Sequence, residues 1–100
     1  PLQSLTQVCI LFGSYITTKQ NPSDLDILFV LDKKNFEKYK RMLNKVQDIT
    51  PIKIQDVIQT TNDLGENLKK EDPVIVGIIK KGIVVWGFDV LVKVIANASE

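Results

Sequence analysis

The sequence predicts an α/β domain with a mixed sheet of about four strands and helices mainly on one face. Two observations carry this prediction. Segments with helical spacing of apolar residues alternate with short apolar runs, and one hundred residues with 44% apolar and 25% charged side chains suit a single domain over 1–100. The apolar runs that read as strands are 8–12, 25–31, 52–60 and 83–86.

The first half of the chain supplies two apolar strands, of which the first is expected at the centre of the sheet. The run 8–12 follows a polar stretch and is apolar on both faces, which is typical of central strands. A short helix or turn at 15–21 and a loop at Pro22 lead to the second strand, 25–31. Asp32 is a suitable cap for a helix to about Gln47, whose apolar residues follow helical spacing.

The second half continues the alternation. After the third strand, 52–60, Thr61 or Asn62 caps a short helix over 63–70. A further helix begins at Asp72-Pro73 and ends at Lys80-Lys81-Gly82, because proline suits its first turn and cations and glycine suit its end. The segment 88–95 fits helical and strand spacing alike, and we expect a helix.

Composition narrows the function classes. The chain has no histidine, which excludes histidine metal ligands and a histidine general base. The net charge is +1, Arg41 is the single arginine and the lysines look scattered, so nucleic acid is not expected as a main partner. Cys9 is expected to be a core residue. No apolar run has membrane-spanning length or signal-peptide character, and this favours the cytoplasm. The chain starts at Pro1 without Met, so a missing N-terminal segment stays open.

Residues suited to ligand binding or catalysis flank the first two strands. Gly13 lets the backbone turn, and Ser14 can cap a following helix and contribute to an anion site. Asp24 and Asp26 lie two apart at the start of the second strand, so they share a face. Two like charges this close favour a divalent cation. Taken alone, Gly13-Ser14 also suits an ordinary loop, and the pair Asp24 and Asp26 also suits a solvated turn.

Asp56 interrupts the apolar phase of the third strand. It sits where the pattern of Ile52, Ile54 and Ile58 favours another apolar residue. An inward carboxylate is costly unless it is paired or bound to a cation. Alternatively, the sheet splays or a bulge shifts the phase, and Asp56 is solvated.

The combination of strand, Gly13-Ser14, short spacer, Ser23-Asp24-Leu25-Asp26 and buried strand resembles the signature of the DNA polymerase beta-like nucleotidyltransferase superfamily. Among its branches the chain is most similar to the minimal nucleotidyltransferases, from about Val8 to Gly87. The resemblance implies the nucleotidyltransferase fold. It also implies that Asp24, Asp26 and Asp56 converge as the catalytic and metal-binding carboxylates for two Mg²⁺ ions, with Asp56 nearer the attacking hydroxyl.

The same resemblance implies that Gly13, Ser14, Ser23 and Lys19 bind the nucleotide. The implied reaction is attack of an acceptor hydroxyl on the α-phosphorus of a nucleoside triphosphate, with ATP as the expected substrate and pyrophosphate leaving. The chain departs from the family pattern at Thr17 and Thr18, where many members have Arg-Gly. A lysine such as Lys19 does not reproduce an arginine fork.

Three hypotheses follow for the whole protein. In the first, it is an active nucleotidyltransferase that moves AMP to an acceptor hydroxyl. In the second, it is the nucleotidyltransferase half of a toxin–antitoxin pair, with a helical HEPN protein as partner. In the third, it is a catalytically degenerate domain that binds a nucleotide or a protein. A small sheet with few helices of its own also favours association, with a partner or with itself as a homo-oligomer, through the apolar segment 88–95.

Overall fold

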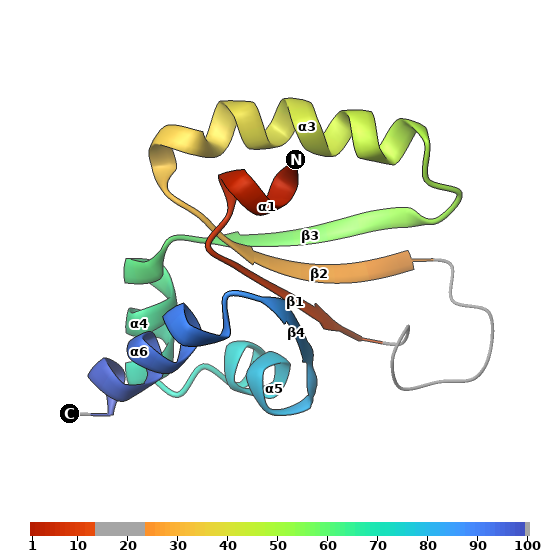
Figure 1. Ribbon diagram of the computed structural model, residues 1–100. Helices are drawn as coiled ribbons and strands as arrows, with labels where there is room; N and C mark the ends of the chain where they lie inside the picture. Colours follow the sequence, from red (N-terminus) through yellow and green to blue (C-terminus); the bar gives the residue numbers. More distant parts are fainter. Residues whose placement is uncertain (14–23, 100) are drawn as a thin grey trace.

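The computed structural model describes residues 1–13 and 24–99, and Figure 1 shows their arrangement. A four-stranded sheet runs through the middle, with helices on both of its faces (Figure 1). The elements in chain order are α1 (Leu2–Leu5), β1 (Val8–Phe12), β2 (Asp24–Val30), the 3-10 helix η1 (Lys33–Asn35), α3 (Phe36–Asp48), β3 (Lys53–Gln59), α4 (Thr61–Lys69), α5 (Pro73–Lys81), β4 (Ile83–Trp86) and α6 (Phe88–Ala98).

The sheet is mixed, as the sequence predicts. Its strand order is β3-β2-β1-β4, with β1 antiparallel to β2 and β4, and β2 parallel to β3. The strand predicted to be central, β1, occupies a central position, and β2 occupies the other. This agrees with their apolar character on both faces. In the parallel pair, Asp26 lies beside Gln55 and Ile27 lies beside Asp56.

The sheet is covered on both faces, which gives the domain two apolar clusters. One face packs against α4, α5 and α6 through residues such as Ile10, Leu28 and Leu64. The other packs against α3 and α1, where Tyr39 is fully buried beside Phe29. Within the described residues both faces of the sheet therefore carry helices, whereas the sequence predicts them mainly on one face.

Local signals set the helix ends. Asp72 caps α5 by accepting hydrogen bonds from the amides of Val74 and Ile75, as predicted. The cap of α4 is Thr60, not Thr61 or Asn62 as predicted, because Thr60 and Asp63 form a reciprocal capping box.

The ambiguous C-terminal segment is helical, as expected. Leu91 is buried in the core beneath the sheet, whereas Phe88 and Val92 remain exposed. Gly87 precedes this helix with a φ of +83°, and a Cβ there would collide with the carbonyl of Gln7. None of the helices in residues 1–13 and 24–99 has the length and apolar character needed to span a membrane.

Candidate functional site

The site begins with two carboxylates at the start of β2. Asp24 and Asp26 are both half-buried. Alternation along the strand places them on the face that also carries Leu28, the face covered by α4, α5 and α6. Asp24 and Asp26 therefore share one face of β2, as their spacing in the sequence predicts.

Gly13 lies directly against Asp26, one member of this pair. Its φ is +81°, which L side chains rarely adopt, and a Cβ there would collide with the Asp26 carboxylate oxygen Oδ2. The antiparallel register explains the proximity, because Phe12 at the end of β1 pairs with Asp26. Only glycine allows the backbone to come this close to the carboxylate.

Gln55 is the third polar side chain at this site, and sequence reasoning missed it. Its Nε2 donates a hydrogen bond to Asp24 Oδ2 at 3.0 Å. Gln55 is exposed and shares a strand face with Val57, which packs in the same cluster as Leu28. The polar phase of the third strand was the available signal, but it identifies Gln55 only once β3 is known to pair with β2 in this register.

The structure does not bring Asp56 to the other two carboxylates. Asp56 lies beside Ile27 in the parallel pair, and its Oδ2 accepts a hydrogen bond of 2.7 Å from the hydroxyl of Tyr39. Tyr39 belongs to α3, on the face opposite to Asp24 and Asp26. The expected convergence of three carboxylates is therefore corrected, because strand alternation turns Asp56 away and a tyrosine pairs with it. Asp56 does face inward, which is one of the two alternatives considered for it, and its partner is a tyrosine instead of a cation.

Burial perturbs two groups on this second face. Burial raises the pKa of the Tyr39 phenol, and the hydrogen bond and charge of Asp56 raise it further. Burial also raises the pKa of the Cys9 thiol from 9.0 to about 11. Cys9 is a buried free thiol, and both groups stay protonated and neutral near pH 7. Neither supplies a nucleophile or a base to the carboxylate pair.

The donor set suits one kind of metal. Residues 1–13 and 24–99 contain no group of three histidine, cysteine, aspartate or glutamate side chains able to hold a metal ion. Asp24 and Asp26 supply carboxylate oxygens, and Gly13 itself adds no side chain beside Asp26. Mg²⁺ is commonly bound by one or two carboxylates together with substrate phosphates, so the pair fits Mg²⁺ bound with a phosphorylated substrate.

The remaining predicted site residues, Ser14, Lys19 and Ser23, lie outside the described residues, as do Thr17 and Thr18. Of the predicted site, the structure thus brings together Gly13, Asp24 and Asp26, and it adds Gln55.

Comparison with known proteins identifies a matching family. A family model described as "Polymerase beta, Nucleotidyltransferase" matches residues 3–89, from α1 to the start of α6. The matched range contains Gly13, both carboxylates, Gln55 and Asp56. No curated protein and no solved structure matches the chain significantly.

Proposed function

The chain belongs to the polymerase beta nucleotidyltransferase family, and from this premise we propose that it transfers a nucleoside monophosphate from a nucleoside triphosphate to an acceptor hydroxyl. The observation that carries the proposal is the pair Asp24 and Asp26 on one face of β2, with Gly13 against Asp26. This arrangement places two negative charges at the end of β1, one of them directly against the backbone of Gly13.

The roles of the residues follow from their positions. Asp24 and Asp26 would hold Mg²⁺ through their carboxylate oxygens, and Gln55 orients Asp24 by its hydrogen bond. Gly13 lets a phosphate approach Asp26 closely, because a side chain there would meet the carboxylate. When bound, Mg²⁺ neutralises phosphate charge and lowers the pKa of a hydroxyl, and two ions would divide these tasks. ATP is the proposed triphosphate on the resemblance described above.

A second candidate function is nucleotide binding without transfer. The observation that favours it is Gln55, which lies beside Asp26 on β3 while Asp56 faces the opposite side. A neutral amide binds a metal more weakly than a carboxylate, so the metal nearer the acceptor hydroxyl would lack a charged ligand from β3. The two candidates share the Mg²⁺-nucleotide site and differ in turnover.

Partners belong to the proposal as well. A helical HEPN protein or a second copy of the chain would cover the exposed apolar side chains of α6, of which Phe88 is 65% exposed and Val92 is 45% exposed. Exposed apolar surface favours association, and it suits a HEPN protein and a second copy of the chain equally.

Calorimetric titration with ATP tests the shared site. We expect weak binding that requires Mg²⁺ and falls at least about tenfold in Asp24→Asn and in Asp26→Asn, because each variant removes one charged ligand of the cation. Asp89→Asn is the matched control, since Asp89 is an exposed carboxylate on α6. Circular dichroism of each variant checks the fold.

A release assay separates the two candidates. Pyrophosphate production that depends on Asp24 supports transfer, whereas Mg²⁺-dependent binding without pyrophosphate supports the second candidate. Binding that ignores Mg²⁺, or that survives both aspartate variants, would contradict the metal-bridged site itself.

A further inference from the structure

One face of α3 carries a row of three cations, Lys38, Arg41 and Lys45, defined here as the α3 basic row. Their spacing of three and four residues places them on one side of the helix. All three are exposed. Within residues 1–13 and 24–99 the ion pair found is Lys69–Glu66, so no described carboxylate forms an ion pair with the row.

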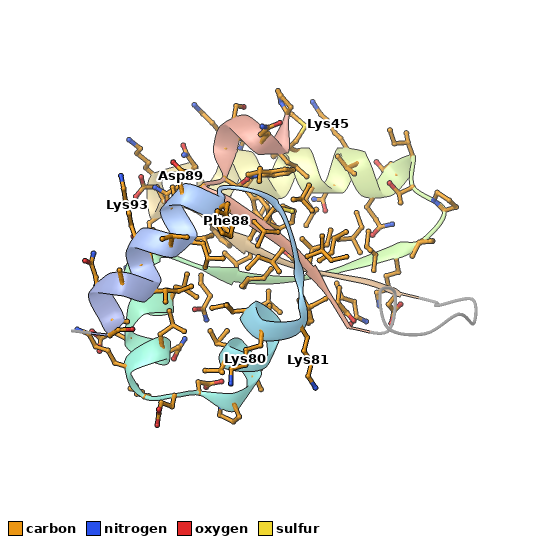
Figure 2. All side chains as sticks on the ribbon, turned by 60° about the horizontal axis from the view of Figure 1, so that its bottom comes forward. Lys45, Lys80, Lys81, Phe88, Asp89 and Lys93 are labelled. Carbon is orange, nitrogen blue, oxygen red and sulfur yellow. The ribbon has the colours of Figure 1, made fainter. Side chains whose placement is uncertain are left out.

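The row borders a groove between two helices. Lys38, Arg41 and Lys45 line a cavity of about 300 Å³ together with residues of α1. Leu5 of α1 and Met42 of α3 add apolar surface to the same cavity. Figure 2 shows Lys45 beside α1.

Charge is concentrated along this part of the chain. The segment 33–48 carries six lysine or arginine residues against two carboxylates, Glu37 and Asp48, although the whole chain has a net charge of +1. Lysines that look scattered along the sequence thus become a row, because the helical period brings every third or fourth residue to one side.

We infer that the α3 basic row and its groove bind the phosphate backbone of a single-stranded nucleic acid. A row of unpaired cations gains affinity for a phosphate chain by releasing its condensed counterions. The row spans about 10 Å, since the helix rises about 1.5 Å per residue. Each of its three cations can contact one phosphate of such a strand.

The groove favours a single strand over a duplex. Arg41 at the middle of the row can contact phosphate bidentately or stack on a base, as lysine cannot. Unpaired bases present apolar faces, which the apolar surface of Leu5 and Met42 can accept, whereas a duplex hides those faces.

The inference is independent of the transfer reaction. The helix α3 covers the face of the sheet opposite to the one that carries Asp24 and Asp26. Binding at the row therefore requires neither Mg²⁺-nucleotide nor the carboxylate pair, and each proposal can fail without the other.

Fluorescence anisotropy with a labelled 12-nucleotide single-stranded RNA tests the inference on the full 100-residue chain. We expect binding whose log affinity falls with log salt at a slope of about −2, from three phosphate contacts at ~0.7 each. The variant Lys38→Gln/Arg41→Gln/Lys45→Gln should lose at least about tenfold in affinity at low salt, and its slope should approach zero.

The matched control is Lys70→Gln/Lys80→Gln/Lys93→Gln. It removes the same net charge from exposed lysines at the end of α4 and on α5 and α6, and Figure 2 shows Lys80 and Lys93 on helices other than α3. We expect its affinity to stay within about twofold of the unmodified chain. Lys38→Arg/Lys45→Arg should retain binding, since it keeps every charge of the row.

Several results would overturn the inference. These are an equal loss of affinity in the two triple variants, no RNA binding at low salt, or tighter binding of a duplex of the same length. Row-dependent binding of poly-glutamate, or of vesicles rich in anionic lipid, that is tighter than binding of the RNA would assign the row to an acidic protein or a membrane surface instead.

Discussion

At the scale of single residues, the site depends on one glycine. Gly13 combines a positive φ with the absence of a Cβ, and both are needed for the end of β1 to lie against Asp26. Gly77 contrasts with it. It lies within α5, and a Cβ there would meet nothing within 4 Å. The same amino acid is therefore required at one position and dispensable at the other.

This contrast yields a matched pair of variants. Gly13→Ala should displace the Asp26 carboxylate and lower Mg²⁺-ATP affinity at least about tenfold, and the strained φ should cost roughly 1–2 kcal/mol of stability. Gly77→Ala should raise stability by about 0.5–1 kcal/mol, because alanine favours the helix interior, and leave affinity unchanged. Calorimetry and urea unfolding measure both effects. Unchanged ATP affinity in Gly13→Ala would remove Gly13 from the site.

At the scale of elements, the contact between α3 and β3 decides which residue of β3 faces Asp24. The hydroxyl of Tyr39 donates to Asp56, and the Tyr39 ring packs edge-on against Phe29 with centroids 5.3 Å apart. These contacts tie Asp56 and its neighbour Ile58 to the α3 face. Gln55 is left on the opposite face, beside Asp24.

Removing the hydroxyl tests this contact. Tyr39→Phe should lower the free energy of unfolding by about 1–3 kcal/mol, because the half-buried Asp56 loses its donor. Asp56→Asn should cost less, since its amide oxygen can still accept from Tyr39. Both variants should keep their Mg²⁺-ATP affinity in calorimetry. If Asp56→Asn abolished nucleotide binding without loss of stability, Asp56 would act at the carboxylate site after all.

The tyrosine also sets a pH dependence. Burial raises the pKa of Tyr39, so the folded chain keeps a proton that the unfolded chain releases near pH 10. The stability contributed by this group is complete below about pH 10 and declines as pH rises further. Tyr39→Phe should remove that part of the decline in urea unfolding measured at rising pH.

At the scale of the whole molecule, the covered sheet still leaves apolar side chains exposed near its edge strand β4. Ile83 and Val85 of β4 are 53% and 49% exposed, and Phe88 and Val92 project from α6. In the described residues β4 pairs with β1 alone, so it is an edge strand. An apolar edge beside an apolar helix face is a common site of association.

Light scattering tests association directly. At about 100 μM the chain should scatter as a species larger than its 11.3 kDa monomer, because association removes the exposed apolar side chains from water. Phe88→Gln/Val92→Gln should shift it toward the monomer. Ile49→Gln is the control, because Ile49 is 85% exposed and follows α3 on the other side of the sheet. A monomer at this concentration would contradict self-association and leave a different protein as the proposed partner.

Local features of the sequence determined most of the fold. The run 8–12 and the signals Asp72-Pro73 and Lys80-Lys81-Gly82 predicted β1 and α5 at their observed bounds, because strand burial and helix capping depend on neighbouring residues. The shared face of Asp24 and Asp26 is equally local, since residues two apart on one strand must point the same way. The place of Gly13 beside them was implied by the family resemblance, and the strand end explained only why a glycine suits that position.

Tertiary structure alone decided the rest of the site. Whether Gln55 or Asp56 faces the carboxylate pair depends on how β3 pairs with β2, and these strands are more than twenty residues apart in the chain. Packing of Tyr39 against Phe29 and its bond to Asp56 made that choice, together with the burial of neighbouring side chains. Alternation within one strand is a property of the local backbone. Which side chains of a strand lie on which face of the sheet is set by the two cores that cover the sheet. The sequence of that strand does not contain those cores.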